Sequence, residues 1–128
     1  MTITVITGTH DTIAQLRSAG HGEFVMVDVD VADLPDPSDV MGALPGDDPR
    51  VFPSMVQLGG EYVVDSATQA CSVVRRVARE SGDDVTVLVH DARGRVQAPA
   101  IGGVVEGFMR TQGYAVELTH TALEEVLV

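Results

Sequence analysis

The segment VTVLVHDARGRVQAPAIGGVVEGFMRTQGYAV, residues 85–116, decides the fold. The β-branched run over 85–90 predicts a buried strand, and the polar residues 91–97 predict a loop. Pro99 suits the first turn of a helix that Gly113 ends. The residues that follow this glycine predict another strand. A strand, a loop, a helix and a second strand in this order are typical of a parallel βαβ unit.

The rest of the chain continues this alternation. The clearest helix covers 61–81, because its apolar residues are spaced by three and four and Gly82 supplies a stop. The sequence therefore predicts a single α/β domain over 1–128, with a small, mostly parallel sheet of about four strands and helices on both faces. The other predicted elements are strands over 2–7, 23–29 and 114–120, helices over 11–19 and 50–59, one helical turn over 40–44 within the proline-rich loop 30–49, and a short terminal helix or tail over 121–127.

Composition narrows the class of protein. Asp and Glu number 19 against 8 basic residues, all of them arginine, which gives a net charge of −11. Such a surface repels a phosphate backbone, so nucleic-acid binding is not expected. Cys71 is the single cysteine, which excludes an internal disulfide and suits the cytoplasm. Its place on the apolar stripe of the long helix predicts a buried structural thiol. No apolar run approaches the roughly 18 residues of a membrane span, and no signal peptide or membrane association is predicted.

The predicted strand ends supply the candidate ligand-binding residues, because sites in parallel sheets lie beyond the carboxyl ends of the strands. The loop around Gly94 predicts an anion cradle of backbone N–H groups at a helix start, with Arg93 and Arg95 adding charge. A surface loop with two solvated arginines explains the same residues equally well. The full candidate set is Gly8, His10, Asp28, His90, Arg93, Gly94, Arg95 and His120.

Histidines and aspartates gather at the same predicted rim. His10, His90 and His120 all fall at strand ends and could share one site, although single histidines are more often structural or solvated. Carboxylates as dense as Asp28, Asp30, Asp33, Asp36 and Asp39 could bind magnesium or calcium. Turn and capping roles beside prolines explain them better, so no metal or cofactor is expected. Without a GxSxG, HExxH or CxxC motif, no catalytic residue is predicted.

Four motifs along the chain resemble the C-terminal domain of the RNase adapter RapZ. That family has D-V-R-F-L-P-N-P, L-x-x-x-T-G-x-D, the signature loop C-T-G-G-K-H-R-S, and a final R-G-x-x-V with H-R-x-L-E. Each motif has a partly matching stretch in the same order here, over nearly the whole chain. The matching stretches are Asp28–Asp30 with Asp33–Pro37, Met41 with Pro45–Asp48, Asp91–Ala98, and Gln112–Val116 with His120–Glu124.

The resemblance implies a domain that senses glucosamine-6-phosphate and contacts small RNA and protein partners. The arginine after the family's D-V pair, and its signature loop, plausibly hold the phosphate. This chain has Asp30 at that arginine, and Val96, Gln97 and Ala98 at the loop histidine, arginine and serine, while Thr121 follows His120. Each lost charge-assisted hydrogen bond costs about 1–3 kcal/mol.

Three functional hypotheses follow. The first is a non-catalytic regulatory module that binds a partner protein, with self-association left open. The second is a binding module for a phosphorylated sugar or another small anionic metabolite. The third, and weakest, is a metal-dependent hydrolase.

Overall fold

The computed structural model describes residues 1–19, 25–42 and 44–123. Strands and helices alternate along these residues, which confirms the predicted α/β class. The strands are β1 (Thr2–Thr9), β2 (Val25–Asp30), β3 (Val85–Asp91) and β4 (Ala115–His120). The helices are α1 (His10–Ala19), α2 (Ser38–Met41), α3 (Val51–Gly59), α4 (Glu61–Ser81) and α5 (Gln97–Thr111).

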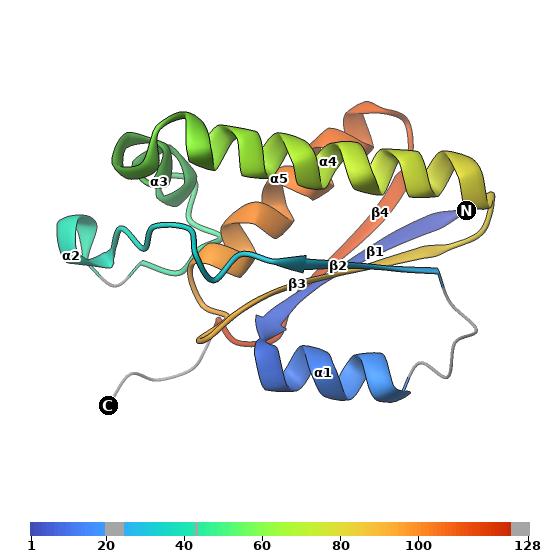
Figure 1. Cartoon of the computed structure of the whole chain (residues 1–128), viewed down its shortest axis with the longest axis horizontal. Coiled ribbons are helices and arrows are strands. Elements are labelled where there is room, and N and C mark those ends of the chain that lie inside the picture. Colours follow the sequence, from blue (N-terminus) through green and yellow to red (C-terminus); the bar gives the residue numbers. More distant parts are fainter. Residues whose placement is uncertain (20–24, 43, 124–128) are drawn as a thin grey trace.

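The strands form one parallel sheet in the order β2-β3-β1-β4. Helix α1 lies on one face, and α4 and α5 cover the other, with α3 packed against these two helices (Figure 1). The central neighbours β1 and β3 therefore send the chain to opposite faces, into α1 and α5 respectively. Such a switch point opens a crevice at the carboxyl ends of the strands, where ligands of α/β proteins usually bind.

The two faces of the sheet carry different side chains. Toward α4 and α5 the strands present Val5, Val27 and Val87, which belong to an aliphatic core with the inner face of α4. Toward α1 the cover is thinner, because Ile13 is the one side chain that this helix buries. The α1 face therefore leaves room for polar residues near the strand ends. The largest fully buried side chains of the described residues include Ile3, Ile13, Met55, Leu88, Ile101 and Met109.

The long helix has the predicted bounds, Glu61–Ser81, and Gly82 follows it in the left-handed conformation. The buried residues of α4 repeat every three or four positions, as expected for a helix packed on a sheet. In the described part of the chain, no helix is both long and apolar enough to cross a membrane.

The predicted end of the first strand was wrong. Gly8 does not end the first strand, since β1 continues to Thr9 and Gly8 pairs with His90. The glycine serves close packing instead, because a Cβ there would lie 2.3 Å from the Thr121 Oγ1 atom. Residues 121–123, the start of the predicted short terminal helix or tail, form turns. Residues 23–24 and 124–127, which were predicted to belong to a strand and to the terminal helix or tail, lie outside the described residues.

Candidate functional site

The carboxyl ends of β1, β2 and β3 bring three candidate residues together on the α1 face. His10 is the first residue of α1, directly after β1, and His90 lies near the end of β3. Asp28 and Asp30 alternate with the buried Val27 and the half-buried Val29 along β2, so both acidic side chains point to the face that His90 occupies. The parallel register and the short β1–α1 connection therefore place the histidines beside the aspartates.

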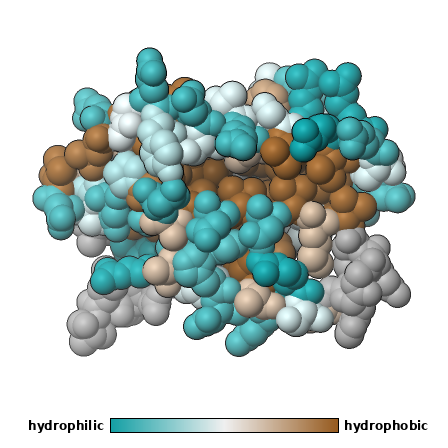
Figure 2. Space-filling model, viewed as in Figure 1, coloured by the Kyte–Doolittle hydropathy of each residue, from teal (hydrophilic) through white to brown (hydrophobic). Residues whose placement is uncertain are grey.

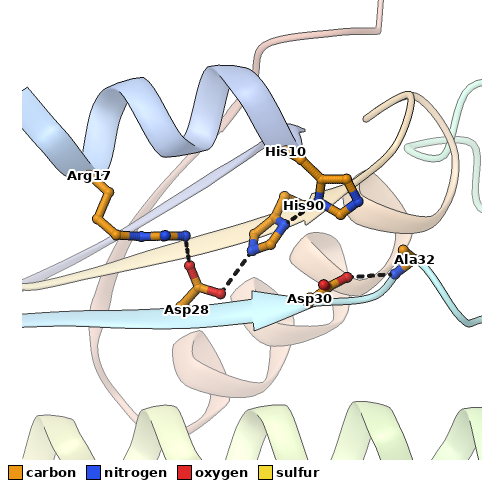
Figure 3. Close-up of polar contacts among 6 residues, drawn as sticks. All are labelled: His10, Arg17, Asp28, Asp30, Ala32 and His90. Carbon is orange, nitrogen blue, oxygen red and sulfur yellow. Dashed lines mark hydrogen bonds and ion pairs between the residues drawn. The ribbon is translucent and has the colours of Figure 1, made fainter.

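A chain of polar contacts links these residues across three elements (Figure 3). The Nδ1 atoms of His10 and His90 lie 2.7 Å apart, with the rings edge to face. The other ring nitrogen of His90, Nε2, lies 2.8 Å from Asp28 Oδ1. The second oxygen of Asp28 accepts a hydrogen bond from Arg17 on α1. The network thus runs from α1 through β3 to β2 and returns to α1.

Asp28 determines the tautomer of His90. An ionised carboxylate can only accept hydrogen bonds, so Nε2 of His90 must donate its hydrogen to Asp28. In neutral His90 the Nδ1 atom then carries a lone pair, which faces His10. His90 is 7% exposed, so this lone pair lies almost entirely inside the protein.

The loop after β3 is organised by Asp91, which lies on the α5 side of the sheet. Its carboxylate accepts hydrogen bonds from the backbone N–H groups of Arg93, Gly94 and Ala98. These belong to the region that the sequence predicted as an anion cradle, and a carboxylate of the chain itself occupies them. The third bond also caps α5, since Ala98 lies in its first turn and Val96 offers no capping side chain.

The remaining candidates of this loop have separate positions. Gly94 has a φ of 69°, and a Cβ there would lie 2.4 Å from the carbonyl carbon of Gly8, so the two glycines allow close backbone packing. Arg93 is exposed, and Arg95 is half-buried with its backbone carbonyl accepting from the N–H of Gly46.

His120 lies apart from the two other histidines. Its Nδ1 atom forms a 2.7 Å hydrogen bond with the Thr7 hydroxyl, and the two residues are paired in the β1–β4 register. Thr7 faces α5, since a Cβ on Gly102 of that helix would lie 2.4 Å from its methyl group. Burial lowers the pKa of His120 below its ordinary value, although the charges of Asp47 and Glu106 oppose this shift. Two of the three predicted histidines therefore meet, and His120 lies on the opposite face of the sheet.

A groove lined by both apolar and acidic side chains follows the edge of β2 that no other described strand pairs with, and it is bounded above by α4 (Figure 2). Its volume is about 390 Å³. At one end the Tyr62 hydroxyl donates a hydrogen bond to Asp33, which raises the pKa of the tyrosine. The lining residues are Val27, Asp28, Val29, Asp30, Val31, Asp33, Leu34, Tyr62, Ser66, Gln69, Ala70 and Val73.

No protein-family model matches the chain, and no curated protein sequence matches it either.

Sequence reasoning missed three parts of this rim. Asp91 directly follows His90 at a strand end, so its position could have been used to predict a capping role. Asp30 was considered within the run of aspartates and at the position of the family's arginine, and not beside a histidine. Arg17 gave no signal, because it reaches Asp28 only through the crossover of α1 over the sheet. The fourth histidine of the sequence, His21, lies outside the described residues.

Proposed function

We propose that the chain is a non-catalytic protein-interaction module that binds an extended segment of a partner protein along the free edge of β2. The observation that supports this function is a strand edge, unpaired within the described residues, beside a groove with valines and aspartates in its lining, formed by β2 and α4. An extended peptide can enter such a groove as an additional strand, with affinity from main-chain hydrogen bonds and specificity from alternate side chains.

The backbone of β2 has donors and acceptors for this strand. The N–H of Val31 donates to the carbonyl of His90 at 2.9 Å, so the backbone of Val31 faces β3. Direction alternates along a strand, and the N–H and C=O groups of Met26 and Asp28 therefore point away from β3. Within residues 1–19, 25–42 and 44–123, nothing pairs with these outward groups. Unpaired edges of this kind are templates for a further strand.

The two sides of β2 define the chemistry of the partner segment. Side chains that point toward α4 would meet Val27, Val29 and Ala70, so apolar residues fit there. Side chains on the α1 face would lie beside Asp28 and Asp30, so basic residues fit at the alternate positions. The net charge of −11 also favours a basic partner and increases its association rate.

A second copy of this chain is a poorer occupant of the same edge. Pairing β2 with its own copy would bring Asp28 and Asp30 close to the same carboxylates, and like charges across strands are destabilising. A small phosphorylated metabolite is also less well supported, because Asp91 already accepts the N–H groups of the predicted cradle.

Kinship with the RapZ C-terminal domain and a cytoplasmic location remain part of this proposal. The β3–α5–β4 unit supplies the strand, loop, helix and strand that the kinship requires. Burial of Cys71, which raises the pKa of its thiol, fits a chain that does not use cysteine for cross-linking.

The test is a fluorescence-anisotropy titration with a labelled peptide of alternating lysine and valine, and a glutamate–valine peptide as its charge-reversed control. We expect the basic peptide to bind with a Kd of about 10–100 μM, and more weakly as salt rises. In heteronuclear NMR spectra, it should shift amide signals of β2 and α4.

Matched variants on one helix locate the site. Ser66→Trp places a large side chain in the groove, so it should reduce peptide affinity at least tenfold. Ser72→Trp makes the same change on α4 outside the groove and should leave affinity unchanged. The proposal would be overturned by no binding at roughly 1 mM peptide, by equal binding of the acidic peptide, or by equal effects of the two tryptophans.

A further inference from the structure

Three metal-ligating side chains from three elements meet on the α1 face. His10 from α1, His90 from β3 and Asp30 from β2 each offer a ligand atom, and these atoms lie within 4.8 Å of one another. His90 is buried, His10 is half-buried and Asp30 is exposed, so the cluster opens to solvent on one side. This grouping differs from the acidic run that the sequence suggested for magnesium or calcium, because two of its three members are imidazoles.

His90 is oriented as a metal-binding histidine is in proteins. Its Nε2–H donates to Asp28, which leaves the Nδ1 lone pair directed toward His10 (Figure 3). Metal-bound histidines usually donate their second N–H to a carboxylate, which sets the tautomer and the ring orientation. Arg17 holds Asp28 in turn, so the supporting carboxylate is itself positioned.

Asp30 is also held in place at the rim. One carboxylate oxygen, Oδ1, accepts the backbone N–H of Ala32 at 3.0 Å, and this bond fixes the side chain in a local turn. Its other oxygen has no hydrogen bond within the described residues. The carboxylate therefore has one oxygen available as a ligand beside the two imidazoles.

We propose that His10, His90 and Asp30 bind one zinc ion. Two imidazole nitrogens and one carboxylate oxygen form a common three-ligand set for zinc, with water in the fourth position. Magnesium and calcium prefer oxygen ligands throughout, so this set disfavours them. The two Nδ1 atoms, 2.7 Å apart, need to separate to about 3.3 Å to bind one tetrahedral zinc ion. The half-buried ring of His10, at the start of α1, can move by that amount.

The test is isothermal titration calorimetry of the tag-free, metal-free protein with zinc chloride. We expect one zinc ion per chain, with release of protons that depends on the buffer. His10→Ala should weaken zinc binding at least a hundredfold, and Asp30→Asn by about 10–100-fold. Asp28→Ala removes the acceptor that orients His90 and should weaken binding by about 10–100-fold as well.

A second histidine supplies the matched control. His120→Gln changes an imidazole on the opposite face of the sheet, so zinc affinity should stay within twofold of the wild type. Circular dichroism should show that His10→Ala and Asp30→Asn remain folded. Both residues are incompletely buried, which favours this outcome. Cobalt should give the intense visible absorption of a tetrahedral site in the wild type, and this signal should be lost in His10→Ala.

Several results would overturn the zinc site. These are no zinc binding, zinc affinity unchanged in folded His10→Ala, or magnesium and calcium binding as tightly as zinc. Failure of this inference is distinguishable from failure of peptide docking. Ser66→Trp should leave zinc binding intact, and His10→Ala should leave binding of the lysine–valine peptide intact.

Discussion

Asp91 is 2% exposed, and its carboxylate accepts three backbone N–H groups between the end of β3 and the first turn of α5. It holds the loop against the sheet and caps the helix with the same side chain. A buried charge is tolerated there because each of its oxygens has a hydrogen-bond donor. The loop's conformation thus depends on one residue that belongs to the preceding strand.

We predict that Asp91→Ala lowers the free energy of unfolding by about 3 kcal/mol, because it leaves buried N–H groups without an acceptor. Urea denaturation measures the change. The control is Arg93→Ala, an exposed position in the same loop, which should stay within about 0.5 kcal/mol of the wild type. Similar stability of the two variants would contradict the organising role of Asp91.

The candidate site was predictable at the scale of single residues only in part. The strand-end rule pointed to His10, Asp28 and His90, because carboxyl ends of parallel strands meet at one edge. It also pointed to His120, which the register places on the other face with Thr7. The face of the sheet to which a side chain points depends on where its strand begins and on its pairing partners. A short β-branched run such as 2–7 does not show which of its alternate residues point to which face.

At the scale of elements, α5 shows two different uses of glycine. Gly102 packs directly on β1, where a Cβ would lie 2.4 Å from the Thr7 Cγ2 atom. Gly103 has no atom within 4 Å of such a Cβ. The sequence suggested that glycines in this helix could allow close packing on a sheet, and the structure supports that interpretation for Gly102 alone.

The two glycines therefore predict opposite effects of the same substitution. Gly102→Ala overpacks the helix–sheet contact and should lower the free energy of unfolding by about 1–3 kcal/mol. Gly103→Ala removes backbone freedom from the unfolded chain and should raise it by up to about 1 kcal/mol. Thermal and urea unfolding of both variants check this. Equal shifts in the same direction would show that the close contact does not constrain the helix.

At the scale of the whole molecule, the charge of −11 opposes folding. Nineteen acidic groups on so small a surface repel one another, and the compact state brings them closest. Raising salt shortens the screening length from about 30 Å at 0.01 M to about 8 Å at 0.15 M. Salt should therefore stabilise this protein.

We predict that Tm rises by on the order of a few °C over that range of salt. Differential scanning fluorimetry in sodium chloride measures the shift. Potassium chloride should give the same result, because screening depends on ionic strength rather than on the cation. A Tm that falls or stays constant would mean that local ion pairs, such as Arg17 with Asp28, outweigh the overall repulsion.

The class and the parallel direction of the sheet followed from the alternation of strands and helices, but the strand order did not. Each strand presents valine side chains toward α4 and α5, so several strand orders bury the same residues. The order places β2 at an edge and β1 in the middle, and both the groove and the histidine–aspartate cluster depend on it.

The central position of β1 has a consequence for how the chain acquires its structure. This strand is synthesised first, yet its two neighbours, β3 and β4, begin at Val85 and Ala115. During synthesis, β1 therefore stays unpaired until most of the chain has left the ribosome. Pairings between residues so distant in sequence are slow to form. An apolar strand that stays unpaired during synthesis is prone to non-native association, so correct folding of this sheet depends on the late-made segments that contain β3 and β4.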